Sequence, residues 1–522
     1  MYLINLMKAT VMIRLRLTIL FIMLCVSVMS YLGCSGTGSS PGEPEFLARV
    51  EVPRYLEDLD LPVYADIEDA EGKYYALVIA KKTQLDEAGV TYRVIDEFIP
   101  GTYYLIALEG VEGARKKAAE LVKVLYDDGE RIIVRYEFEL SELLPDLGFD
   151  LKLMSQTPIY ANTDERRALA KSAFSSVTYP IVKNAKVEAM LKAVTEENIK
   201  LSTEQLSGEK QVEVDGALVN ILTRHTYSGK DGVDKATQYV FDRLEGMGLT
   251  ASFSPWTFKY KGKSVSNRNV VGEIKGESAP EEIVLLIAHL DSISDAEDGI
   301  EPGADDNASG CVALLTAAKI MSSRTAELPK KRVYKFKRTI RFVFTTGEEQ
   351  ALLGGIAYAE KVDKERQKIV AVLNLDMIGY SKLKPTDPPK PKQQIKIRNH
   401  DYQTAYNKDL PIAQAYIDVV KTYGMDQVFE AVIVDDGEAN SDHSPFWDLM
   451  QTCIDRGDPQ NLCYPAAWII EYAEKGYLNP KMHTRNDKVN IPEIHSMNLP
   501  YYAAVVKAAM GTAAHLAEIV MD

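Results

Sequence analysis

Strongly apolar runs alternate with amphipathic helical patterns through the second half of the chain. The runs "IVLLIA" (283–288) and "IRFVF" (340–344) consist almost entirely of apolar residues, which is typical of strands that are covered on both faces. Residues 234–249 instead repeat apolar side chains with a helical period and end at two glycines, Gly246 and Gly248, which predicts a helix with a defined stop. Strands and helices that alternate in this way predict an α/β domain with a largely parallel sheet.

The first half of the chain has a different pattern. Two stretches, 74–96 and 131–154, each begin with a β-rich run and continue through a short helical segment and a glycine into a second alternating run. Leu85 lies in the first helical segment and Leu144 in the second. We therefore predict a small α+β module over residues 46–160, built on a repeated β-α-β unit.

This module contains no histidine, and no catalytic constellation is visible in it. Two interpretations of its role stay open. It is either a propeptide-like inhibitor that covers a cleft until it is cut away, or a permanent binding domain. Residues 161–185 are rich in charge and helix-forming residues, which predicts a helical connector, and the second domain then occupies 186–522.

The amino terminus has the order of an export signal. Basic residues precede the uncharged apolar run 17–33, and small polar residues follow Cys34. We expect residues 1–34 to be a signal peptide, a bacterial lipoprotein signal or a retained anchor, and lipidation of Cys34 stays an open alternative. Each of these predicts an exported protein, either secreted, periplasmic or tethered to a membrane.

Length, charge and cysteine content narrow the class of protein. A chain of 522 residues is long enough for at least two domains. Its net charge of −15 argues against binding to nucleic acid or to an anionic membrane surface, both of which need basic patches. Cys311 lies in an apolar helical pattern and is predicted to be a buried free thiol, whereas Cys453 and Cys463 flank a polar loop and are predicted to form a disulfide.

Polar residues gather where the apolar strands end. Because the carboxyl ends of parallel strands lie at one edge of a sheet, we expect these side chains to meet. Two adjacent carboxylates at such a place need positive charge nearby, and imidazole with carboxylate is a ligand set that suits zinc. The residues concerned are His289, Asp291, Asp305, Asp306, Glu348, Glu349, Asp376 and His483.

Six motifs in order carry a resemblance to a known family: "AHLDS", "PGADDNASG", "TTGEEQALLGG", "NLDMIGY", "SDHSPFW" and "MHTRND". In these motifs the stretch from about 186 to 520 resembles the co-catalytic zinc aminopeptidases typified by bacterial leucyl aminopeptidases. The resemblance implies a three-layer αβα sandwich with a mixed, mostly parallel sheet. Residues before about 186 fall outside the stretch on which the resemblance rests.

The resemblance also assigns roles to five metal ligands. It implies that His289 and Asp376 bind one Zn²⁺ ion, that Glu349 and His483 bind a second, and that Asp306 bridges the two.

Two further residues would complete the chemistry. Glu348 would be the general base that takes a proton from the metal-activated water and passes it to the leaving amine. Asp291 lies two residues beyond His289 on the same side of the strand, where it would accept the second imidazole N–H and fix the ligand tautomer. Asp442 and His443 of "SDHSPFW" are expected to support the site rather than to act in catalysis.

The leading hypothesis is therefore a zinc exopeptidase that removes amino-terminal residues from peptides. Alternatives are a carboxypeptidase or a glutaminyl cyclase-like enzyme of the same fold, and a binding domain that has lost catalysis. A cyclase would not need both carboxylates of "GEE", and a binding domain usually has a damaged ligand set, whereas all five ligands are present here. The residue preference and the oligomeric state do not follow from the sequence.

Overall fold

The computed structural model of the protein describes most residues from 43 onward, and Glu45–Asp522 forms one compact unit. None of the described helices is both long and apolar enough to cross a membrane. The predicted signal at 1–34 and the residues 161–177 of the predicted connector lie outside the described part. Within 43–522 the residues not described are 53–58, 60, 69–72, 98–102, 108–112, 128, 130, 136–148, 155–177, 261–262, 297–298, 325–331, 385–386, 388, 399–402, 450–452, 454–463, 475, 491–496 and 522.

Two four-stranded antiparallel sheets precede residue 154. The first has the order β2-β3-β1-β4 and the second the order β6-β7-β5-β8. If the four strands of each sheet are counted along the chain, both sheets place them side by side in the order second, third, first, fourth. Their elements are β1 (Glu45–Glu51), β2 (Val63–Glu68), β3 (Tyr74–Lys81), α2 (Lys82–Glu87), β4 (Tyr92–Glu97), β5 (Tyr103–Ala107), α3 (Ala114–Leu121), β6 (Val124–Asp127), β7 (Arg131–Arg135) and β8 (Asp150–Leu153).

The two stretches that look alike in sequence occupy equivalent places in these sheets. Strands β3 and β4 flank β1, and β7 and β8 flank β5 in the same way. In the first stretch α2 joins the two flanking strands and buries Leu85, whereas Leu144 of the second stretch lies outside the described residues. Each central strand is antiparallel to both of its neighbours, so the two strands of each repeat run parallel to each other.

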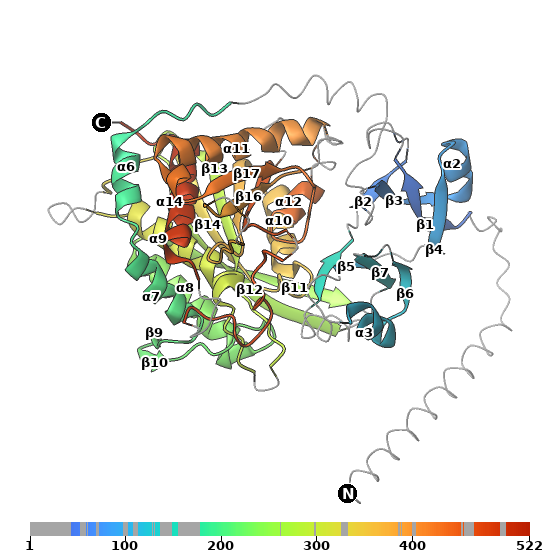
Figure 1. Ribbon diagram of the computed structural model, residues 1–522, viewed down its shortest axis with the longest axis horizontal. Coiled ribbons are helices and arrows are strands. Elements are labelled where there is room, and N and C mark those ends of the chain that lie inside the picture. The colour runs from blue at the N-terminus through green and yellow to red at the C-terminus, as the bar shows by residue number, and fades with distance from the viewer. Residues whose placement is uncertain are drawn as a thin grey trace, which may run out of the picture. The chain divides into compact units, whose positions relative to one another are not determined.

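An eight-stranded mixed sheet forms the centre of the second half of the chain (Figure 1). Its order is β11-β12-β14-β13-β15-β18-β16-β17, and the neighbours β14-β13, β13-β15, β15-β18 and β16-β17 are parallel. This confirms the predicted mixed, mostly parallel sheet. The strands are β11 (Thr250–Tyr260), β12 (Lys263–Ile274), β13 (Ala279–His289), β14 (Arg338–Thr345), β15 (Lys368–Leu375), β16 (Lys392–Lys396), β17 (Glu430–Val434) and β18 (Ala466–Glu471).

Helices cover both faces of this sheet. Helices α8 (Val233–Gly246), α9 (Gly310–Met321), α11 (Gln403–Thr422) and α14 (Leu499–Leu516) belong to one buried cluster, and α10 (Leu353–Lys364) and α12 (Ser444–Asp448) to another. Alternate residues of β13 enter the two clusters, Leu286 the first and Leu285 the second, as the two-residue period of a strand requires. The three-layer αβα sandwich is thereby confirmed.

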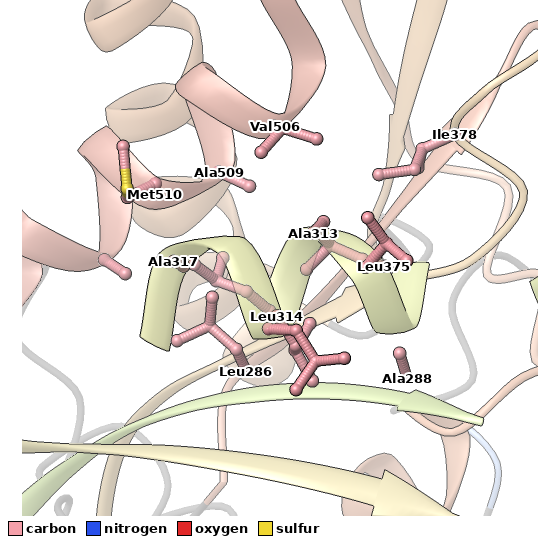
Figure 2. Close-up of a cluster of buried hydrophobic side chains, with 14 of the residues drawn as sticks. Leu286, Ala288, Ala313, Leu314, Ala317, Leu375, Ile378, Val506, Ala509 and Met510 are labelled. Carbon is pink, nitrogen blue, oxygen red and sulfur yellow. The ribbon is translucent and has the colours of Figure 1, made fainter. Parts of the chain in front are cut away.

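In the buried cluster that includes α8, α9, α11 and α14, helix α9 packs against the sheet near the edge that carries the polar residues. Figure 2 shows Ala313, Leu314 and Ala317 of α9 between Leu286 of β13 and Met510 of α14. All five side chains are buried. Because α9 begins four residues after Asp306, this packing also determines where that carboxylate lies.

The remaining described elements are short or peripheral. Helices α6 (Ala185–Lys192) and α7 (Glu196–Leu206) pack against α14 (Figure 1). The others are β9 (Val212–Val214), β10 (Ala217–Val219), η3 (Gly229–Asp231), η4 (Ala304–Ser309) and η5 (Met425–Gln427).

Strands β14, β13, β15 and β18 are adjacent and parallel, so their carboxyl ends lie along one edge. His289 is the last residue of β13, and Asp376 directly follows β15. Glu348 and Glu349 come within four residues of the end of β14. The topology therefore brings the predicted polar residues to a single place.

Candidate active site and metal centre

Two groups of buried ligand-type side chains share Asp306. His289, Asp306 and Asp376 form one group, and Asp306, Glu349 and His483 form the other. Asp306 turns Oδ1 to His289 Nε2 at 3.2 Å and Oδ2 to His483 Nε2 at 3.0 Å. One carboxylate therefore faces both groups with different oxygens, which is the geometry that a bridging ligand needs.

The second carboxylate of each group lies at a similar distance from the histidine. His289 Nε2 lies 3.2 Å from Asp376 Oδ1, and His483 Nε2 lies 3.2 Å from Glu349 Oε2. Ligands at the 2.0–2.1 Å typical of Zn–N and Zn–O bonds are about 3.3 Å apart in a tetrahedral site. The histidine–carboxylate distances of both groups therefore suit a zinc ion, and the ligand atoms of each group lie within 4.8 Å of one another.

The electrostatics of the two groups also suit a bound cation. Burial and the Asp306 carboxylate raise the pKa of Glu349 to about 7, although His483 opposes this shift. Burial disfavours charge on His483, but the carboxylates of Glu349 and Asp306 raise its pKa well above the ordinary value. Glu349 Oε1 is buried without a hydrogen-bond partner among the described residues. Buried groups perturbed in this way suit a metal ion, whose charge would offset the crowding.

Glu348 lies beside both groups, farther from the histidines than the ligand carboxylates are. Its Oε2 is 4.0 Å from His289 Nε2, and it lines a cavity of about 20 Å³ together with Glu349, Asn440 and Leu151. A cavity of that size holds roughly one water molecule. Burial, together with the nearby carboxylates of Asp376 and Glu349, raises the pKa of Glu348 well above its ordinary value.

Asp291 has a different contact from the one predicted. His289 Nδ1 lies 3.1 Å from the backbone oxygen of Asp291 and 3.9 Å from its carboxylate Oδ1. The carboxylate instead accepts the backbone N–H groups of Glu348 and Glu349, at 3.3 and 3.2 Å. The tautomer of His289 is therefore set by the Asp291 carbonyl, because the side chain turns toward the Glu348–Glu349 turn.

The turn that carries the two glutamates is held from strand β12. Asn269 Nδ2 donates to Gly354 O at 2.8 Å, and Thr346 N donates to Asn269 Oδ1 at 3.1 Å. Both ends of the turn are thus bonded to one side chain. Trp256 Nε1 adds a hydrogen bond to Thr346 Oγ1 at 3.0 Å.

The segment 435–443 supports Asp376 from the other side. Ser441 Oγ donates to Asp376 Oδ2 at 2.6 Å, and Asn374 Nδ2 donates to Ser441 Oγ at 2.7 Å. Asp442 accepts a hydrogen bond from Thr345, and His443 Nε2 lies 2.8 Å from Glu438 O. Thr345 and Glu438, the partners in these two contacts, belong to segments that frame the site.

Asp487 is a residue that the sequence analysis missed. Its carboxylate accepts the backbone N–H groups of Asp305 and Asp306, at 3.0 and 2.9 Å, and the amide of Asn479 at 3.3 Å. Asp305 itself accepts from Gly379 N at 2.7 Å, so it lies behind the site rather than in it. The position of Asp487 in "MHTRND", four residues after His483, was the available signal.

The structure describes two of the three cysteines that follow residue 34. Cys311 is a buried free thiol, as predicted, and donates to the backbone oxygen of His289 at 3.0 Å. Cys453 is disulfide-bonded. Because Cys463 lies outside the described residues, its pairing with Cys453 stays a prediction.

Fold and site together define a protein with a metal-ligand set at the carboxyl edge of an α/β sheet. Residues 269–505 match peptidase family M28. The protein is 29% identical over 259 residues to a probable leucine aminopeptidase of Arthroderma otae, covering 47% of this chain and 67% of the relative. It is 33% identical over 193 residues to a probable zinc metalloprotease of Pyrenophora tritici-repentis, covering 33% and 42%. These matches confirm the resemblance seen in the motifs and support a metallo-aminopeptidase.

Solved structures show how far the fold similarity extends. The LapA aminopeptidase of Legionella pneumophila matches with a TM-score of 0.50 at 21% identity, and LapB of the same organism with 0.52 at 17%. Each alignment covers 80% of this chain and 99% of the other. Residues 186–522 are 337 of 522 residues, about 65%. The shared fold therefore extends to residues before 186, where the sequence motifs show no resemblance.

Proposed function

We propose that this protein is a zinc-dependent aminopeptidase that binds two Zn²⁺ ions and uses Glu348 as general base. The observation that carries the proposal is the division of Asp306 between two ligand groups, one oxygen to His289 and the other to His483. Glu348 lines the cavity beside the second group, where a base must lie to reach an attacking water.

Glu348 and Asp291 have different roles in the proposed reaction. Bound zinc would supply Lewis-acid charge to the scissile carbonyl and to the attacking water. Glu348 holds the proton of that water and returns it to the leaving amine, and its raised pKa suits a group that must both accept and release a proton. Asp291 keeps Glu348 and Glu349 in register, because its carboxylate accepts both of their backbone N–H groups.

The curated relatives support amino-terminal over carboxyl-terminal cleavage. Several of them are named probable leucine aminopeptidases.

The test compares the wild-type protein with Glu348→Gln. Both are assayed for zinc per protein molecule and for hydrolysis of peptides with a free or an acetylated amino terminus. We expect about two zinc ions in each protein, cleavage of free-amino peptides only, and a loss of about 10²–10⁴-fold in kcat in the variant. Wild-type activity on acetylated peptides from their carboxyl end would overturn the polarity. A variant with full activity would overturn the role of Glu348.

We also propose that the protein is exported, from the order of basic, apolar and small residues at 1–34. The test is fractionation of cells that produce the full-length protein, with mass spectrometry of the mature amino terminus. A start at Cys34 that bears acyl groups would support a lipoprotein, and a start just beyond it without acyl groups a secreted protein. Intact residues 1–34 on a cytoplasmic protein would contradict export.

A further inference from the structure

Arg224 is a fully buried arginine next to the proposed metal centre, with an exposed fraction of 0%. Its Nε donates to Leu290 O at 2.6 Å and its Nη2 to Gly303 O at 2.9 Å. Its Nη1 donates to Leu206 O at 3.0 Å and to Pro302 O at 2.6 Å. Four of the five guanidinium N–H groups are thus used, and all four acceptors are backbone carbonyls.

These carbonyls belong to segments that carry two of the proposed ligands. Leu290 directly follows His289, and Gly303 lies three residues before Asp306. Leu206 ends helix α7 and supplies a fixed point outside the site. One side chain therefore ties the end of strand β13 to the loop that presents Asp306.

Gly303 permits the close contact between Arg224 and the loop that presents Asp306. Its φ of +45° is left-handed, and a Cβ atom there would lie 2.8 Å from Arg224 Nη2 and 2.1 Å from Asp306 O. A larger residue would push the guanidinium away from the loop. The close approach of Arg224 to the Asp306 loop thus depends on a glycine at this position.

The guanidinium also contributes charge among buried carboxylates. Desolvation lowers the pKa of Arg224, and the negative charges of Asp487, Asp306 and Asp291 raise it. An arginine stays protonated in such surroundings. Arg224 thus places a permanent positive charge next to a cluster of acidic groups.

We propose that Arg224 is a positioning residue for the metal centre, which holds His289 and Asp306 at metal-binding separation before any ion arrives. The inference rests on the proposed two-metal function. A lysine cannot replace this arginine, because a single ammonium cannot reach four carbonyls that surround a planar fork. Loss of the planar guanidinium frees the loop that presents Asp306, and part of the zinc-binding energy is then needed to order that loop.

The experiment measures zinc affinity by competition with a chromophoric chelator in Arg224→Lys and in the wild type, both as full-length proteins. We expect the dissociation constant of the weaker zinc site to rise about 10–100-fold, the range found when residues behind metal ligands are changed. The absorption spectrum of the Co²⁺-loaded protein should change as well, because that spectrum reports ligand geometry.

Arg341→Lys is the matched control. Arg341 is also a buried arginine, 9% exposed, and it bonds Glu273 Oε1 at 2.6 Å and the Tyr358 hydroxyl at 3.1 Å, away from the ligands. It should lower the melting temperature without changing zinc affinity. If Arg224→Lys lowers the melting temperature to a similar extent and binds zinc as the wild type does, Arg224 is only structural and the inference is wrong.

A second variant decides the case if Arg224→Lys does not fold. Thr223 directly precedes Arg224, and its hydroxyl donates a hydrogen bond to Glu301, which directly precedes Pro302. Thr223→Val removes only this hydroxyl. It should raise the zinc dissociation constant, by less than the roughly 10–100-fold expected for Arg224→Lys, because only part of the tie to the 301–303 loop is lost. An unchanged constant would contradict the inference. A wild type that binds fewer than two zinc ions would instead overturn the proposed function.

Discussion

Glu348 and Glu349 show how two neighbouring residues of one type take different positions. The Glu349 carboxylate lies 3.2 Å from His483, whereas Glu348 faces the small cavity and lies 4.0 Å from His289. Their backbone N–H groups share the Asp291 carboxylate. The backbone of the turn is thereby held while the two side chains diverge, which places a ligand and a base within reach of one water molecule.

Asp442 offers a pH test at the level of one residue. Burial raises its pKa to about 7, from an ordinary value of 3.8, with Asp291 and Asp376 adding to the shift. Between these values the folded protein binds a proton that the unfolded protein has released. The stability that this proton contributes is fully present below about pH 4 and is lost as the pH rises through about 7, by up to about 1.4 kcal/mol per unit.

We therefore expect the metal-free Asp442→Asn variant to lose less melting temperature between pH 5 and pH 8 than the metal-free wild type. The amide is neutral throughout and still accepts from Thr345. The measurement is a series of thermal melts in chelator. Parallel curves for the two proteins would show that Asp442 does not titrate in this range.

Sequence reasoning at the residue scale brought His289, Glu349 and Asp376 together because each lies at or just after the end of an apolar strand. Asp306 and His483 do not directly follow a strand, and the motifs were needed to include them. Arg224, Ser441 and Asp487 were missed because their contacts join segments far apart in the sequence, 65 residues apart between Ser441 and Asp376 and 181 between Asp487 and Asp306. Apart from the place of Asp487 in "MHTRND", no local pattern indicates such a bond.

Among the elements, the turn between β14 and α10 determines the position of the base. Asn269 on β12 bonds both ends of this turn and is buried, with 1% of its surface exposed. Asn269→Ala leaves the backbone N–H of Thr346 buried without its partner, at about 1–3 kcal/mol, and removes the side-chain hydrogen bond to Gly354 O. We expect a clear fall in melting temperature and in kcat.

Asn269→Asp distinguishes the contributions of the two hydrogen bonds that Asn269 makes. The carboxylate can still accept from Thr346 N but cannot donate to Gly354 O, so we expect an intermediate fall in both quantities. Thermal melts and steady-state kinetics check this order. Wild-type kcat in Asn269→Ala would show that the turn keeps its position without the asparagine.

The elements themselves were largely predictable, since long apolar runs and helical periods are local. The pairing of β16 was not. It lies antiparallel to β18, with Gln393 opposite Glu471, and parallel to β17. Its sequence, "KQQIK", has no run of apolar residues, so only the strands beside it define it as part of the sheet.

At the scale of the whole molecule, the amino-terminal module reaches the site. Leu151 of β8 lines the cavity beside Glu348 and Glu349. Ala351, two residues beyond Glu349, belongs to the same buried cluster as Ile106 and Ile132 of the module. A cavity of about 20 Å³ has no room for a peptide. These contacts favour the interpretation of the module as an inhibitor.

Leu151→Asp tests this interpretation in the full-length protein. A carboxylate cannot lie beside Glu348 and Glu349 without repulsion, so the module should loosen and kcat/KM for short free-amino peptides should rise several-fold. Val94→Asp is the control, because Val94 is 42% exposed on β4 and should change nothing. Equal kcat/KM in all three proteins would favour a permanent binding domain instead.

The relation of the module to the site could not be predicted from the sequence. Its strands follow from local alternation, but the surface on which they pack depends on residues such as Phe258 and Val265 of the catalytic domain. Those residues lie in ordinary strand patterns. Contacts between domains leave no periodic signal in either partner.

We infer that Asp306 joins two metal sites. A crystal structure of the zinc-loaded protein, with anomalous scattering recorded at the zinc edge, tests this inference. We expect two peaks about 3.5–4 Å apart, one next to His289 and Asp376 and the other next to Glu349 and His483, with Asp306 between them. A single peak, or two peaks of which only one contacts Asp306, would contradict it.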